Sequence, residues 1–173
     1  MKSFLDPTEI LKRLKLRKDM IAADFGSGSG GWAIPLAEKL EEGKVYAVDL
    51  LEEPLSALRA RAKTEKISNI QTVLANVEKG VDTLREASCN LVLMTNLFSQ
   101  CQDIKKILSE GQRVLKPDGR ILIVDWQRDN PLTEQVEKVS FEEIKKTASE
   151  FGLKIEKEFD AGSYHYAMVF TKN

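Results

Sequence analysis

Short apolar runs alternate with amphipathic stretches along most of the chain. Runs such as KVYAVD and NLVLMT have the length of buried strands, and the stretches between them space apolar residues by three or four, as helices do. The pattern predicts strands over residues 20–25, 44–49, 70–75, 90–95, 120–126, 153–159 and 164–171. It predicts helices over 7–14, 31–40, 54–66, 103–115 and 140–151, with a helical turn over 81–87.

Strands that alternate with helices favour a mostly parallel sheet covered by helices on both faces. The last two strands are joined only by residues 160–163, so they form an antiparallel hairpin. No repeat, low-complexity tract or linker divides the sequence. We therefore expect a single α/β domain over 1–173, in which residues 1–19 form a short N-terminal helix and lid segment.

Composition narrows the class of protein. The 173 residues are 42% hydrophobic and 31% charged, with a net charge of -1. This balance argues against nucleic acid or an anionic membrane as a partner. No apolar run approaches the ~18 residues of a membrane span, and no signal peptide is visible. Cys89 and Cys101 lack metal-site spacing, so we expect no metal and a reduced, cytoplasmic protein.

The sequence ADFGSGSGGW, residues 23–32, places four glycines after the first predicted strand. As Gly26-x-Gly28-x-x-Gly31 it matches the dinucleotide fingerprint. It also reads as Asp24-x-Gly26-x-Gly28-x-Gly30, which points to a different nucleoside ligand. Asp24 would repel a pyrophosphate but would suit a cation such as the amino group of an amino-acid ligand.

Further residues carry a resemblance to a known family. They are Asp49 at the end of the second strand, the pair Asn76-Val77 after the third, the stretch RVLKPDGRILIVDW and the terminal hairpin. With the glycine motif, the chain resembles a class I S-adenosylmethionine-dependent methyltransferase. It is most similar to the small bacterial ubiquinone/menaquinone C-methyltransferase group. The resemblance implies a Rossmann-like three-layer sandwich, sheet order 3-2-1-4-5-7-6, and S-adenosyl-L-methionine as cofactor, with S-adenosyl-L-homocysteine as product.

The resemblance also assigns cofactor contacts by position. The glycines of the turn would lie against the amino-acid part, Asp49 would hold the ribose, and Asn76 would meet the adenine amine where the family more often has Asp. The implied set is Asp24, Gly26, Gly28, Gly30, Asp49, Leu50, Asn76, Val77, Thr95 and Asn96. Structural alternatives stay open: Asn76 could close a turn, Asp49 could cap a helix, and Thr95 and Asn96 could be turn residues only.

Candidates for catalysis lie at the carboxyl edge of the sheet. Asp125 ends the fifth strand, and His165 begins the antiparallel last strand, which the implied order makes its neighbour. The two side chains could therefore meet, although packing alone could explain His165. A general base is needed only if the acceptor loses a proton.

The nature of the acceptor is least constrained. Little sequence is available for a lid, and the charge is near neutral, so we expect a small apolar or aromatic molecule as acceptor. A protein or RNA acceptor, or a non-catalytic S-adenosylmethionine-binding module, are the alternatives. The oligomeric state is left open.

Overall fold

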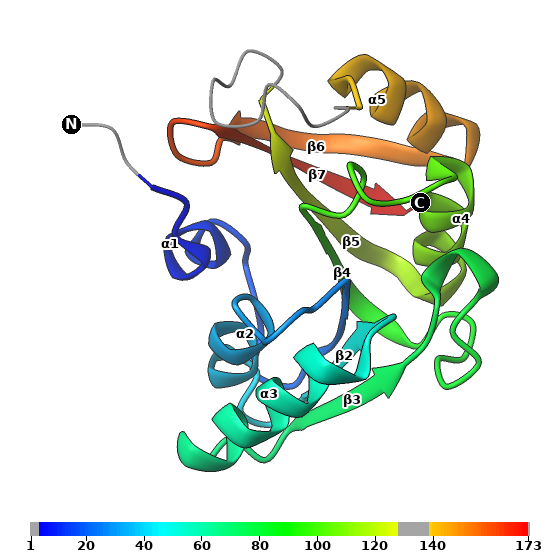
Figure 1. Ribbon diagram of the computed structural model, residues 1–173. Helices are drawn as coiled ribbons and strands as arrows, with labels where there is room; N and C mark the ends of the chain where they lie inside the picture. The colour runs from blue at the N-terminus through cyan, green and yellow to red at the C-terminus, as the bar shows by residue number, and fades with distance from the viewer. Residues whose placement is uncertain (1–3, 128–138, 173) are drawn as a thin grey trace.

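The computed structural model describes residues 4–127 and 139–172, which form one seven-stranded sheet between two layers of helices (Figure 1). The strand order is β3-β2-β1-β4-β5-β7-β6, as predicted. Strand β7 runs antiparallel to both β5 and β6, which confirms the predicted hairpin. The strands are β1 (Ile21–Phe25), β2 (Lys44–Asp49), β3 (Ile70–Leu74), β4 (Cys89–Thr95), β5 (Leu115–Trp126), β6 (Leu153–Asp160) and β7 (His165–Lys172).

Helices cover both faces of this sheet. They are α1 (Pro7–Lys12), α2 (Ala33–Lys39), α3 (Glu52–Thr64), α4 (Ile104–Val114) and α5 (Phe141–Glu150), together with a short 3-10 helix η1 (Val77–Lys79). Helices α1 to α3 lie on one face, and α4 and α5 lie on the other (Figure 1). Loops therefore lie at the carboxyl ends of the parallel strands.

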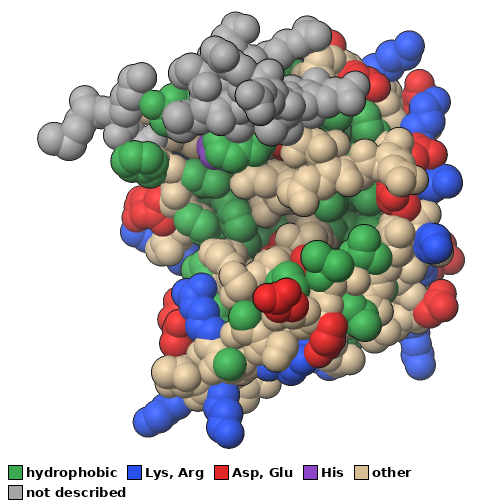
Figure 2. Space-filling view, in the orientation of Figure 1, with side chains coloured by type: hydrophobic (Ala, Val, Ile, Leu, Met, Phe, Trp, Pro, Cys, Tyr) green, Lys and Arg blue, Asp and Glu red, His purple; other side chains and the backbone are tan. Residues whose placement is uncertain are grey.

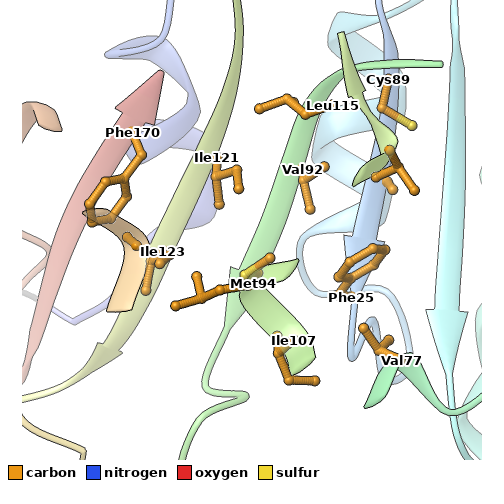
Figure 3. Packing of buried hydrophobic residues seen from close by; sticks show 14 of the residues in the cluster. Phe25, Val77, Cys89, Val92, Met94, Ile107, Leu115, Ile121, Ile123 and Phe170 are labelled. Carbon is orange, nitrogen blue, oxygen red and sulfur yellow. The ribbon is translucent and has the colours of Figure 1, made fainter. Parts of the chain in front are cut away.

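Alternate residues of the central strands serve two separate cores. In β4, Leu91 and Leu93 pack toward α1, α2 and α3, whereas Val92 and Met94 pack toward α4 and α5. Figure 3 shows the second core, where Met94 lies among side chains from β1, β5 and α4. A strand with both faces buried is apolar throughout, which is why NLVLMT shows no polar alternation.

Local sequence signals account for where the helices begin. Asp103 accepts hydrogen bonds from the N–H groups of Lys105 and Lys106 at the start of α4. Ser140 accepts one from the N–H of Glu143 at the start of α5. Such side chains satisfy the N–H groups that have no partner within the helix. They therefore mark where α4 and α5 begin.

Two local predictions need correction. The helical turn predicted over 81–87 is wrong: that stretch forms non-helical turns, and the 3-10 helix lies earlier, at Val77–Lys79, where Asn76 caps it. The fifth strand, predicted over 120–126, begins earlier: β5 starts at Leu115 and includes residues 116–119. Leu115 pairs with Cys89 and Arg120 with Leu91, so the four residues between them bulge from the ladder. Asp118, with φ of 61°, makes the bend.

Candidate active site

A cavity of about 510 Å³ opens where β1, β2, β3 and β4 end. Ligands of open α/β sheets bind at this edge, and the volume lies within the usual range for small-molecule sites. Hydrophobic side chains, together with backbone and uncharged polar side chains, surround the hollow in Figure 2. The cavity is lined by Gly26, Ser27, Gly28, Trp32, Asp49, Leu50, Leu51, Pro54, Ala75, Asn76, Val77, Glu78, Thr95, Asn96, Leu97, Gln100, Cys101 and Ile107.

The glycine turn forms one wall, but its glycines have different roles. Gly28 has φ of 53°, and a Cβ there would meet no atom within 4 Å. Its backbone therefore faces open space in the cavity wall. Gly30 has φ of 93°, and a Cβ there would overlap Leu58 Cδ1 of α3. Gly30 thus permits helix packing and does not line the cavity.

Asp49 joins the glycine turn to the second strand. Its Oδ2 accepts a hydrogen bond from the N–H of Gly28 at 2.8 Å, and its Oδ1 accepts one from Leu51 at 3.0 Å. Each carboxylate oxygen keeps further acceptor capacity. The carboxylate therefore fixes the turn and still presents acceptors to the cavity.

Asn76 and Val77 form the wall beyond β3. The Asn76 side chain caps η1 by accepting a hydrogen bond from the N–H of Glu78 at 2.9 Å. Asn76 therefore closes a turn, as the structural alternative predicted, and it also lines the cavity. Val77 is the first residue of η1, where a backbone N–H has no partner within the helix. Leu50 and Leu51 stand beside this wall with 61% and 60% of their surfaces exposed. Two such exposed leucines suit an apolar ring.

Two buried polar atoms on the cavity wall have no hydrogen-bond partner. They are Ser27 Oγ, between the first two glycines, and Asn96 Oδ1, just after β4. Asn96 takes a left-handed φ of 48°, and its N–H donates to Val124 O at 2.8 Å. A buried polar atom without a partner is costly, so both atoms are suited to a polar ligand. Thr95 lines the same side and is buried.

Asp24 lies behind the wall and is completely buried. Neither carboxylate oxygen has a hydrogen-bond partner. Burial, reinforced by the nearby Asp49 carboxylate, raises the pKa of Asp24 to about 7. Asp24 is therefore a buried acid poised to ionise near neutral pH, although it does not itself line the cavity.

Asp125 is held by the loop that follows β4. Its oxygens accept hydrogen bonds from the N–H of Phe98 at 3.2 Å and of Trp126 at 2.8 Å. Burial raises the pKa of Asp125, and the backbone hydrogen bonds oppose the rise. Its register partner in β7 is Tyr166, whose pKa is raised by burial and by the Asp125 carboxylate.

His165 does not meet Asp125. Its register partner is Trp126, and their ring centroids lie 4.0 Å apart. Successive residues of a strand point to opposite faces, so His165 and Asp125 lie on opposite sides of the sheet. His165 is buried, its Nε2 has no hydrogen-bond partner, and burial lowers its pKa. Neither residue lines the cavity described above.

Several cavity residues escaped sequence reasoning. Ser27 lies inside the glycine motif, and its small polar side chain was a usable signal. Three further parts of the chain reach the site without any spacing in the sequence that marks them: Glu78 of η1, Gln100 and Cys101 after β4, and Ile107 of α4. Among the described residues, no cluster of His, Cys, Asp or Glu could hold a metal ion. None of the helices within 4–127 and 139–172 is long and apolar enough to cross a bilayer.

A family model described as a methyltransferase domain matches residues 23–123, more than half of the chain. The chain belongs to this methyltransferase family. The matched residues run from the glycine turn to β5 and include the cavity walls. The resemblance to class I S-adenosylmethionine-dependent methyltransferases is thereby confirmed, and S-adenosylmethionine is the cofactor that this membership implies.

Individual relatives agree with this assignment. Demethylmenaquinone methyltransferase of Listeria welshimeri is 26% identical over 153 residues, which are 87% of this chain and 64% of that protein. The chain thus spans less than two thirds of the length of that curated relative. A methyltransferase from Aquifex aeolicus described as SAM-dependent has a TM-score of 0.87 at 24% identity, covering 98% of this chain and 90% of that one. Phospholethanolamine N-methyltransferase 2 of Haemonchus contortus, solved with S-adenosylhomocysteine, has a TM-score of 0.80 at 19% identity, covering 96% of this chain and 52% of that one.

Proposed function

We propose that this chain transfers the methyl group of S-adenosylmethionine to a small apolar or aromatic acceptor. The observation that carries the proposal is the cavity at the ends of β1 to β4. It is lined by a backbone-exposed glycine turn, a carboxylate and two unpartnered polar atoms. All of these belong to a chain of the methyltransferase family.

The donor set fits the proposed cofactor part by part. The Asp49 carboxylate supplies acceptors for the hydroxyls of a ribose. Leu50 and Val77 supply apolar surface for a ring, and Asn76 supplies a side-chain amide at its edge. Ser27 Oγ and Asn96 Oδ1 are buried acceptors without partners, which suit the charged amino-acid end. Asp24 adds a buried negative charge behind that end when it ionises.

The chain contributes chiefly by placing and enclosing the reactants. The bound cofactor supplies a methyl group already activated by its positive sulfur. The glycine turn and Asp49 form a preorganised wall, and proximity of this kind can supply a large part of a rate enhancement. The buried hydrogen bond from the Phe98 N–H to Asp125 ties the loop after β4 to the end of β5.

His165 is the base that we propose for acceptors that lose a proton. Burial lowers its pKa, so the imidazole is neutral, and able to accept a proton, at neutral pH. Asp125 already accepts two backbone hydrogen bonds, which favours a positioning role for it over proton transfer. A proton-transfer role for Asp125 remains a prediction.

The proposed acceptor class has support from the relatives. The Listeria relative is named for methylation of demethylmenaquinone. The exposed Leu50 and Leu51 add apolar surface at the edge of the cavity, which supports an apolar acceptor. The net charge of -1 gives no general attraction to RNA.

Two measurements test the proposal in sequence. Calorimetry with S-adenosylmethionine, S-adenosylhomocysteine and NAD should show binding of the first two only. Radiolabelled S-adenosylmethionine should then be incubated with a panel of small aromatic acceptors, including a demethylmenaquinone analogue, and with protein and RNA fractions. We expect label in a small-molecule product.

The alternatives predict other results. Label in the protein or RNA fraction would move the acceptor to a macromolecule. Tight cofactor binding with no transfer to any acceptor would favour a non-catalytic binding module. Binding of NAD alone would exclude the proposed cofactor.

A further inference from the structure

Glu78 connects two walls of the cavity that are far apart in the sequence. It is the middle residue of η1, directly after Asn76 and Val77. Its Oε1 accepts hydrogen bonds from the N–H groups of both Gln102 and Asp103, each at 2.6 Å. A single carboxylate oxygen therefore joins the β3 side of the cavity to the chain that enters α4.

The segment held by Glu78 is part of the cavity. Gln100 and Cys101, directly before the two bonded N–H groups, line the cavity, as does Ile107 in the second turn of α4. Asp103 is the N-cap of α4, so this hydrogen bond connects Glu78 to the start of that helix. A shift of this segment would move one wall of the site relative to the other.

The side chain of Glu78 is committed to this contact. Among the described residues it forms no ion pair, and its side-chain carboxylate accepts hydrogen bonds from the N–H groups of Gln102 and Asp103. Hydrogen bonds from N–H groups to a carboxylate are stronger than neutral ones. Burial, together with the Glu78 charge, raises the pKa of Cys101 to about 11, which agrees with the carboxylate lying close to the loop.

We propose that Glu78 is a positioning residue of the cofactor site, which couples binding of the cofactor to ordering of the loop 100–103. The inference rests on the proposed function, because it concerns the same cavity. A ligand that contacts both Val77 and the loop after β4 spans the two walls joined by Glu78. Binding should therefore strengthen the contact, and loss of the contact should weaken binding by the same factor.

The test compares Glu78→Ala and Glu78→Gln, with Glu86→Ala as control, because Glu86 is an exposed acid in the neighbouring turn. Calorimetry with S-adenosylhomocysteine should show binding weakened roughly tenfold or more for Glu78→Ala. Glu78→Gln keeps an oxygen acceptor and should recover most of the affinity. Glu86→Ala should bind as the unaltered protein does.

Amide hydrogen exchange at Gln102 and Asp103 reports on the contact directly. In the unaltered protein, S-adenosylhomocysteine should slow exchange at both amides, and Glu78→Ala should speed it in the absence of ligand. This measurement decides the question even if Glu78→Ala does not fold, because the unaltered protein alone shows whether binding protects these amides. No change in their exchange on binding would overturn the inference.

The outcomes separate the two proposals. A folded Glu78→Ala variant that binds S-adenosylhomocysteine as tightly as the unaltered protein would overturn the role of Glu78 and leave the proposed function intact. Failure of the unaltered protein to bind S-adenosylhomocysteine would contradict the proposed function itself, and this inference with it. A loss of thermal stability without a change in affinity would reduce Glu78 to a structural residue.

Discussion

Asp49 Oδ2 lies 2.8 Å from the backbone nitrogen of Gly28 and accepts its hydrogen bond. The carboxylate that the family resemblance assigns to a ribose thus also holds the glycine turn in place. One residue therefore shapes the cavity wall and supplies acceptors to whatever lies against it. Its removal should harm binding through both effects.

Asp49→Ala should weaken S-adenosylhomocysteine binding while the protein remains folded. Hydrogen bonds to charged groups contribute roughly 1.5–3 kcal/mol, so a loss on the order of 10- to 100-fold is expected. Calorimetry measures the affinity, and circular dichroism checks the fold. Asp49→Asn keeps one oxygen acceptor and should show a smaller loss. Unchanged affinity in Asp49→Ala would remove this residue from the site.

Gly28→Ala should impair cofactor binding more than Gly31→Ala does. A Cβ at either glycine would meet no atom within 4 Å, but only Gly28 has a positive φ and lines the cavity. Alanine in the left-handed region costs about 1–2 kcal/mol, and a larger side chain, as in Gly28→Val, would also enter the space for the ligand. Paired calorimetry and thermal melts separate affinity from stability. Equal affinities for the two alanine variants would show that Gly28 does not face the cofactor.

Gly30→Ala should behave differently from Gly28→Ala and Gly31→Ala, because a Cβ at Gly30 would overlap Leu58 Cδ1. We expect it to lower the free energy of unfolding, since α3 must move away or the turn must distort. Urea unfolding measures the change. A stability equal to that of the unaltered protein would contradict the packing role given to Gly30.

Asp24 should make the ligand-free protein less stable as the pH rises. Its pKa is about 7 in the folded protein, against 3.8 for an unburied aspartate. The folded state therefore holds the proton more tightly, so the contribution of Asp24 to stability is greatest below pH 4 and falls until the pH passes about 7. Between pH 5 and 8 the loss is on the order of 2 kcal/mol.

Asp24→Asn should remove this pH dependence, because the amide does not titrate. Urea unfolding of both proteins without ligand, at pH 5 and pH 8, measures the difference in slope. The same variant should bind S-adenosylmethionine more weakly at pH 8, where the acid would otherwise be charged. Parallel pH profiles for the two proteins would mean that Asp24 does not ionise in this range.

The strands were accessible from the sequence because each central strand is a short apolar run between helical stretches. The hairpin followed from a link of four residues, and the order itself came from the resemblance carried by the motifs. The 3-10 helix was misplaced because its determinant is one side chain, Asn76, capping the residues that follow. A cap of this kind cannot be predicted from hydrophobic periodicity.

The relation between Asp125 and His165 shows why the site was harder to predict. Strand order makes β5 and β7 neighbours, but a register difference of one residue decides which side chains share a face. The observed register pairs Asp125 with Tyr166 and Trp126 with His165. Glu78 was missed for another reason, because its partners are backbone N–H groups, which any residue provides.

His165 provides the sharpest test of the chemistry. If it is the general base, His165→Ala should lower turnover by roughly 10²–10⁴-fold and leave S-adenosylhomocysteine affinity unchanged, since the cavity residues are untouched. Burial lowers its pKa, so the fall in rate on acidification should come below the ordinary value of about 6.5. Initial rates across pH, on an acceptor identified as above, measure both effects.

His165→Phe separates proton transfer from packing. The His165 ring packs against Trp126 with centroids 4.0 Å apart, and phenylalanine keeps an aromatic ring there without a nitrogen. If His165 is the base, both variants should lose turnover. If His165 only packs against Trp126, His165→Phe should behave as the unaltered enzyme does, and His165→Ala should lose only thermal stability. Turnover of both variants within a few-fold of the unaltered enzyme, with an unchanged pH profile, would mean that methyl transfer here needs no base. Placement of the two reactants would then account for the reaction, as displacement at an already activated carbon allows.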